Sequence, residues 1–147
     1  MMKGSFRLMN NKTIFSIISL TFALILGQAQ AGFAASAVTV SSSGNGVFAL
    51  QGAMESVGAM DITLTYDTST LANPRVENGG LISGALTAVN LNIPGTVRMA
   101  IIRTTPIQGS GVIATLTFDR RGGSPGKITA LSARLSNTDG RQLPAVV

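Results

Sequence analysis

The sequence predicts an all-β protein, an antiparallel β-sandwich built from about eight or nine short strands. Three observations support this fold. From residue 38 onward, apolar and polar residues alternate in short runs, which is typical of strands that bury one face. Turn-forming glycine, proline and asparagine residues separate these runs about every 8 to 12 residues. The chain has 147 residues, and no repeat or linker divides the part that follows the leader, so we expect one domain.

The first 31 residues are expected to be a cleaved signal peptide. Lys3, Arg7 and Lys12 form a basic opening, residues 13–27 are uncharged and mostly apolar, and residues 29–31 (AQA) give a small-x-small cleavage pattern. A membrane anchor is the alternative interpretation, but the apolar run is shorter than the roughly 20 residues that a span requires.

Cleavage fits after residue 31 and also after residue 35 or 37, so the folded domain is expected to cover residues 38–147. Three of the 11 basic residues lie in the leader, which leaves eight against six acidic ones, a net charge of +2. The eight are scattered, which disfavours nucleic-acid binding. No second apolar segment follows, so the mature chain is expected to be secreted without a membrane span, to the periplasm, the cell surface or the medium.

The alternating runs define the expected strands. The strongest run, residues 60–66, alternates isoleucine, leucine and tyrosine on one face with Asp61, Thr63 and Thr65 on the other. The other expected strands cover residues 37–41, 47–51, 75–78, 81–88, 96–102, 112–118, 127–136 and 141–146.

The segments between these strands carry turn chemistry. Asp67 is expected to cap a single helical turn over residues 67–71. Gly84 interrupts residues 81–88 and suggests a bulge or bend. Residues 109–111 (GSG) predict a break, and residues 137–140 (NTDG) predict a β-hairpin turn.

Five ordered segments of the mature chain resemble the cohesin domain, the module that clasps dockerin domains in cellulosomes and related secreted assemblies. They are GAMDITLTYDTSTL (58–71), GGLISGAL (79–86), NIPGTVRMAI (92–101), GSGVIATLTF (109–118) and LSNTDGRQL (135–143). The resemblance implies a nine-stranded jelly-roll sandwich. It also implies that one flat sheet face receives the helices of a dockerin partner, which itself carries the calcium.

The resemblance also implies which residues contact the partner. Asp61 falls on a strand position whose carboxylate often contacts the dockerin, with Thr63 on the same outward side. Arg98, Ala100 and Ile102 are the outward positions of another strand of that face. The sequence departs from well-known members at residues 59 and 103, which puts partner specificity rather than the fold in doubt.

Each of these residues also has an ordinary interpretation. Asp61, Arg98 and Arg103 are equally consistent with solvated side chains that contact no partner. Alternation turns both Ile102 and Ile113 toward solvent; isolated exposed apolar residues are normal, whereas a joined patch marks an interface.

Composition excludes most catalysis. The chain has no histidine and no cysteine, which excludes nucleophiles activated by histidine and metal sites built on these residues. The six carboxylates form no pair suited to glycoside hydrolysis. Direct sugar binding is disfavoured because tryptophan is absent, Tyr66 is the only tyrosine, and Phe48 and Phe118 are expected in the core.

The sequence therefore predicts a non-catalytic secreted module without a cofactor. Its expected function is to dock dockerin-type partners in extracellular assemblies that are linked to polysaccharide breakdown. Two alternatives stay open. The chain is a structural or surface-assembly subunit that self-associates, or it binds carbohydrate directly.

Overall fold

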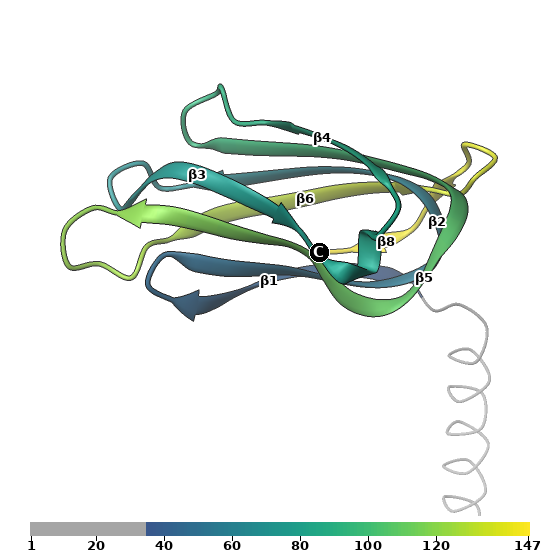
Figure 1. The fold of residues 1–147 in the computed structure, drawn as a ribbon, viewed down its shortest axis with the longest axis horizontal. Helices are drawn as coiled ribbons and strands as arrows, with labels where there is room; N and C mark the ends of the chain where they lie inside the picture. The colour runs from purple at the N-terminus through teal and green to yellow at the C-terminus, as the bar shows by residue number, and fades with distance from the viewer. Residues whose placement is uncertain (1–34) are drawn as a thin grey trace, which may run out of the picture. The chain divides into compact units, whose positions relative to one another are not determined.

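The computed structural model describes residues 35–147, so the predicted signal peptide lies outside the described residues. The described chain forms eight strands and a 3-10 turn, η1 (Gly80–Ile82) (Figure 1). The strands are β1 (Ser36–Gly44), β2 (Val47–Tyr66), β3 (Leu71–Asn78), β4 (Leu86–Asn90), β5 (Thr96–Arg120), β6 (Ile128–Ser136), β7 (Gln142–Leu143) and β8 (Ala145–Val146).

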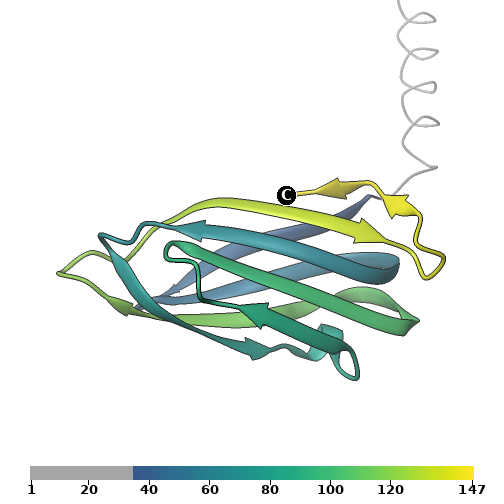
Figure 2. The ribbon, with the colours of Figure 1, turned by 90° about the horizontal axis from the view of Figure 1, so that it is seen from above.

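Two sheet layers share the long strands β2 and β5. The second half of β2 pairs with the first half of β5 and with β6, and β4 completes this layer beyond β5. The first half of β2 pairs with β1 and with the second half of β5, which in turn pairs with β3. Figure 2 shows the first layer running from β4 at the bottom of the view to β6 at the top. The predicted all-β sandwich is confirmed.

The two long strands bend where the chain passes from one layer to the other. In β2 the pairing register shifts between Met54 and Val57 and again before Ala59, and Ser56 adopts a positive φ of 55°. Val57 pairs with Ile107 of β5 at this bend, and both side chains are fully buried. The predicted strands 47–51 and 60–66 are therefore parts of one strand, as are 96–102 and 112–118. The break predicted at residues 109–111 is wrong, because the strand bends there without ending.

The core lies between the two layers and follows the predicted alternation. Ile62, Leu64 and Tyr66 face inward with at most 8 % of their surface exposed. The Phe118 ring packs edge-on against Tyr66, with centroids 4.9 Å apart, and against Phe48, at 5.7 Å. Edge-to-face packing is the arrangement that aromatic rings favour. The predicted core positions of the two phenylalanines are confirmed.

The expected outward position of Ile113 is wrong. Leu50 pairs with Ala114 and Gln51 with Val112, so Ile113 is an extra residue at a β-bulge. The bulge resets the alternation and turns Ile113 into the core, where it is fully buried. A prediction from strict alternation cannot account for one residue inserted at a bulge.

The turns agree better with the sequence than the strand ends do. The Asp67 carboxylate accepts a hydrogen bond from the Ser69 amide at 2.9 Å, as predicted for a cap, although the turn is too short to be a helix. The predicted hairpin over residues 137–140 joins β6 to β7. In contrast, Leu81 and Ile82 belong to η1 where strand was predicted, and the final strand is broken at Pro144 into β7 and β8.

Candidate functional site

The outer face of the β4–β5–β2–β6 layer is built from side chains that line up across the strands. This face is called the docking face here. Three rows cross it in the order β4, β5, β2, β6. They are Leu86–Ile102–Ala59–Ser136, Ala88–Ala100–Asp61–Arg134 and Asn90–Arg98–Thr63–Ser132.

All five residues that the sequence singled out belong to these rows. Asp61 pairs with Ala100 and Thr63 pairs with Arg98 across β2 and β5, and Ile102 lies one row away. Thr63 is half-buried and the other four are exposed. The structure therefore brings the five together on one solvent-accessible face; their contact with a partner stays a prediction.

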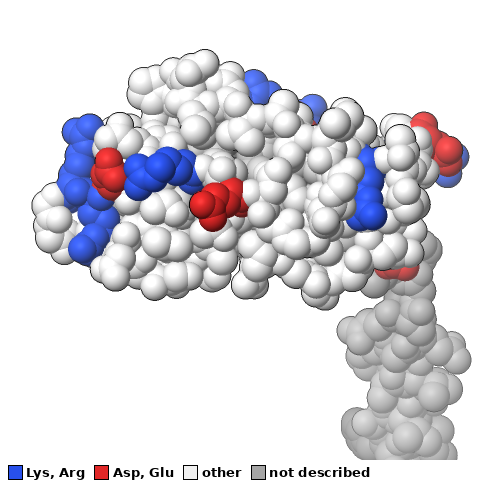
Figure 3. Space-filling view, viewed as in Figure 1, with Lys and Arg blue, Asp and Glu red and all other residues white. Residues whose placement is uncertain are grey.

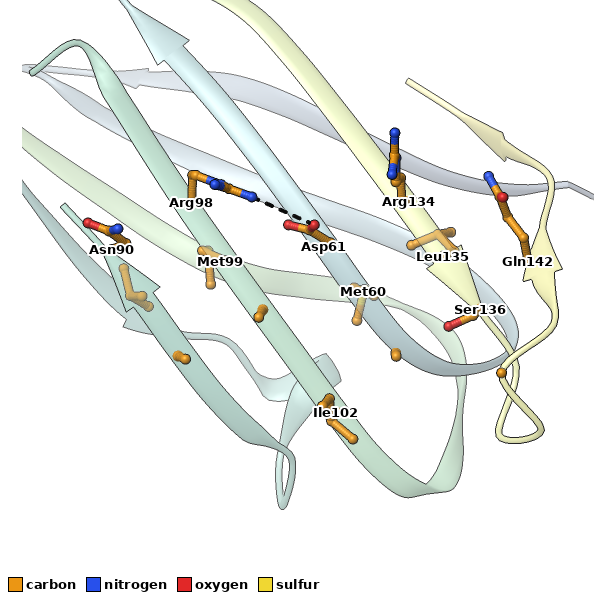
Figure 4. A pocket seen from close by; sticks show the side chains of 15 residues that line it. Met60, Asp61, Asn90, Arg98, Met99, Ile102, Arg134, Leu135, Ser136 and Gln142 are labelled. Atoms are coloured by element: carbon orange, nitrogen blue, oxygen red, sulfur yellow. Dashed lines mark ion pairs between the residues drawn. The ribbon is translucent and has the colours of Figure 1, made fainter. Parts of the chain in front are cut away.

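The middle of the docking face is charged. The Arg98 guanidinium Nη2 lies 3.9 Å from Asp61 Oδ2, and both side chains are about half exposed, at 53 % and 52 % (Figure 4). On the other side of β2, the register partner of Asp61 is Arg134 of β6. An exposed ion pair of this kind contributes only about 0.2 to 1 kcal/mol to stability. The carboxylate is therefore available to a partner at little cost to the fold.

One end of the docking face is apolar. Ile102 is 57 % exposed and Leu86, directly opposite it on β4, is 77 % exposed. Between this pair and the charged middle lie only the methyl groups of Ala59, Ala88 and Ala100. Small side chains keep this part of the sheet flat, which permits close approach by another backbone.

A shallow hollow of about 620 Å³ opens on the same face. Residues of β4, β5, β2 and β6 line it, and Gly140 and Gln142 close it beside β7 (Figure 4). Asp61, Arg98 and Arg134 border the hollow on one side and Ile102 on the other. The two chemically distinct parts of the docking face therefore meet at a single depression.

Two residues of this face were missed from the sequence. Arg134 follows the outward alternation of residues 127–136, but only the pairing of β6 with β2 shows that it faces Asp61. Leu86 lay inside a predicted strand, but only the β4–β5 register shows that it lies opposite Ile102. Ile113, expected as a second exposed isoleucine, is not on the face, and Leu86 takes its place in the apolar patch.

The opposite layer carries a separate group of charged side chains over β3 and the end of β5 (Figure 3). Arg75 Nη2 lies 3.0 Å from Asp119 Oδ1, and the Asn73 amide donates to the other carboxylate oxygen at 2.8 Å. These hydrogen bonds, first from Asn73 and then from Arg75, lower the pKa of Asp119. The group ties β3 to β5 and has a structural role.

Neither a metal site nor a membrane helix is found in the described part of the chain. Among residues 35–147, no three histidine, cysteine, aspartate or glutamate side chains lie close enough to hold a metal ion. Within the same range, no helix has the length and hydropathy needed to cross a membrane.

Solved structures with a similar fold are cohesins. A non-cellulosomal cohesin from Archaeoglobus fulgidus aligns with a TM-score of 0.64 and 16% identity, covering 77% of this chain and 86% of that chain. The seventh ScaB type I cohesin of Pseudobacteroides cellulosolvens gives 0.61 and 17% identity, with coverages of 76% and 85%. A type I cohesin–dockerin complex from Clostridium thermocellum gives 0.62 and 17% identity, with coverages of 78% and 89%.

At these identities the likeness shows the fold alone. No curated protein matches the chain. The family model described as "Cohesin domain", however, matches residues 45–145, which include nearly all of the described sandwich. The chain belongs to the cohesin domain family.

Proposed function

We propose that this protein is a secreted, non-catalytic module that binds a dockerin-bearing partner through the docking face. Membership of the cohesin family supports a binding role. The similar solved structures include complexes of a cohesin with a dockerin, among them one from Clostridium thermocellum and one from Acetivibrio cellulolyticus. The proposal adds that calcium resides on the partner, and that the assembly is extracellular and linked to polysaccharide breakdown.

The observation that carries the proposal is the arrangement of the three cross-strand rows. A flat, alanine-rich centre lies between an exposed apolar pair and an exposed carboxylate, which forms an ion pair with Arg98 and has Arg134 as its register partner on β6. An amphipathic helix can rest on such a centre, because nothing larger than a methyl group stands between Ile102 and Asp61 on β5 and β2. The hollow then takes side chains from the helix.

The face also defines what the partner must offer. Ile102 and Leu86 require an apolar side chain, which would bury surface that is now more than half exposed. Asp61 accepts hydrogen bonds and therefore requires a hydroxyl, amide or cationic donor. Arg98 and Arg134 outnumber the single carboxylate, so an acidic group on the partner would complete the charge balance.

Asp61→Arg tests the proposal. The change places a third guanidinium between Arg98 and Arg134 and removes the acceptor, so we expect affinity for the cognate dockerin to fall at least about a hundredfold, or roughly 2.7 kcal/mol. Titration calorimetry in calcium, with dockerin-bearing proteins of the same organism, measures this loss. Glu77→Arg is the matched control, because it makes the same charge change on an exposed residue of β3 in the other layer.

The two variants separate a local effect from a general one. We expect Glu77→Arg to bind as the unsubstituted protein does. Equal losses in both variants would show that net charge, and not the docking face, governs binding. Absence of binding by the folded, unsubstituted protein to every dockerin of the organism would refute the dockerin proposal itself.

A further inference from the structure

The edge of β4 differs from the other sheet edges of residues 35–147. β4 pairs with β5 on one side only, and no backbone hydrogen bond from a described loop covers its other side. An uncovered edge presents a row of unpaired amide and carbonyl groups, which is a template for a further strand. Figure 1 shows β4 along the upper border of the sandwich.

β3, β6 and the short β8 are protected in the ways that sheet proteins use. β3 contains Pro74, which cannot donate to a new ladder, and is irregular at Asn73, whose φ is +51°. The same strand carries Arg75 and Glu77. β6 carries the exposed Arg134. β8 covers only Ser36 and Ala37 of β1, so the rest of β1 is also an open edge, but its exposed side chains are those of threonine and serine. Charge, proline, irregular pairing and short length each discourage edge-to-edge association.

β4 has none of these protections. No charged residue and no proline occurs within it, and the chain is uncharged from Glu77 to Arg98. Among residues 35–147, six large hydrophobic residues are exposed; four of them lie in or beside this edge, and the other two are Val146 and Val147. The four are Leu86, Val89, Ile93 and Ile102.

We propose that β4 pairs with β4 of a second copy, in antiparallel orientation about a two-fold axis. The partner is a second copy because the edge is self-complementary. Antiparallel pairing of one strand with itself satisfies the backbone groups of both strands and brings no like charges together. With Ala88 at the axis, Leu86 would lie beside Asn90 and Val89 beside Thr87 of the second copy, which removes part of the exposed apolar surface of β4 from water. Such a dimer joins two docking faces into one continuous sheet.

Val89→Lys tests the edge. Val89 is 40 % exposed on β4, and a lysine there would place two like charges close to the two-fold axis. We expect a dimer in sedimentation equilibrium of the unsubstituted protein, and a dissociation constant at least about tenfold higher for Val89→Lys. The matched control is Val146→Lys on β8, which makes the same change at a valine that is 59 % exposed, and should leave the dissociation constant within about twofold.

Cross-linking tests the geometry directly. The chain has no cysteine, so a single introduced thiol reports one position only. In a two-fold antiparallel pair one residue faces its own copy with a Cα–Cα distance of about 4.5 to 5.5 Å, within the range of a disulfide. Single cysteines placed along β4, with Ala88→Cys at its centre, should therefore form dimers at one or two positions, whereas Thr63→Cys in the middle of the docking face should not.

The dimer experiments can fail independently of the dockerin-binding experiment, because Asp61→Arg should weaken dockerin binding and leave the β4 dimer intact. A protein that remains monomeric at about 1 mM would overturn the β4 pairing. A larger effect of Val146→Lys, or faster cross-linking through Thr63→Cys, would overturn it by locating the contact elsewhere.

Discussion

The clearest test of the packing compares two isoleucines of the same strand. Alternation in the sequence predicts that the side chains of Ile102 and Ile113 both point to solvent. In the structure Ile102 is 57 % exposed, whereas Ile113 is fully buried at a bulge. The same substitution to alanine at both sites should therefore have different effects on the free energy of unfolding.

The magnitudes follow from burial. Ile113→Ala removes three buried carbon atoms, a transfer loss of about 2.4 kcal/mol at about 0.8 kcal/mol each, and leaves a cavity that adds to it. We expect a total of about 3 to 4 kcal/mol. At Ile102 less than half of the side chain is removed from water, so the loss should be about 1 kcal/mol or less.

Urea unfolding of the two variants, with linear extrapolation to water, measures both values. If Ile113→Ala leaves too little stability for a folded baseline, the milder pair Ile113→Val and Ile102→Val makes the same comparison, with about 1 kcal/mol expected for the buried site alone. Equal losses at the two positions would refute the bulge and the burial that it explains.

Two further predictions concern turns. Hydrogen bonds from the Ser69 hydroxyl (2.6 Å) and amide (2.9 Å) lower the pKa of Asp67, so its stabilising effect is complete above the unfolded pKa of about 3.9 and is lost as pH falls through the lower folded pKa. Asp67→Ala should accordingly lower the urea midpoint at pH 7 and have a smaller effect as the pH falls below about 3.9; an effect that does not decrease with pH would contradict this. Gly44 and Gly46 both have positive φ, so alanine at either should cost about 1 to 2 kcal/mol. Gly46→Ala should cost about 1 to 3 kcal/mol more, because its Cβ would lie 2.6 Å from the Phe118 carbonyl oxygen, whereas nothing lies within 4 Å at Gly44; thermal unfolding of the two variants checks the order.

Much of the docking face could be predicted from the sequence because strand alternation is a local property. Burying Ile62, Leu64 and Tyr66 forces Asp61 and Thr63 outward, whatever the rest of the chain does. The same reasoning placed Arg98, Ala100 and Ile102 outward on their strand. The resemblance to cohesins then assigned both strands to one face, and the register of β2 with β5 agrees.

What the sequence by itself determined is the list of local facts: which runs are strands, which side chains each strand turns outward, and which turns join them. Only the tertiary structure decided how these pieces meet. The bulge that buries Ile113, the continuity of β2 and β5 through both layers, and the open edge of β4 depend on pairing between strands distant in sequence. Likewise, the registers of β6 and β4 place Arg134 opposite Asp61 and Leu86 opposite Ile102. Register is set by packing of the whole sandwich, since one inserted residue reverses the face of every side chain beyond it, and no local pattern contains that information.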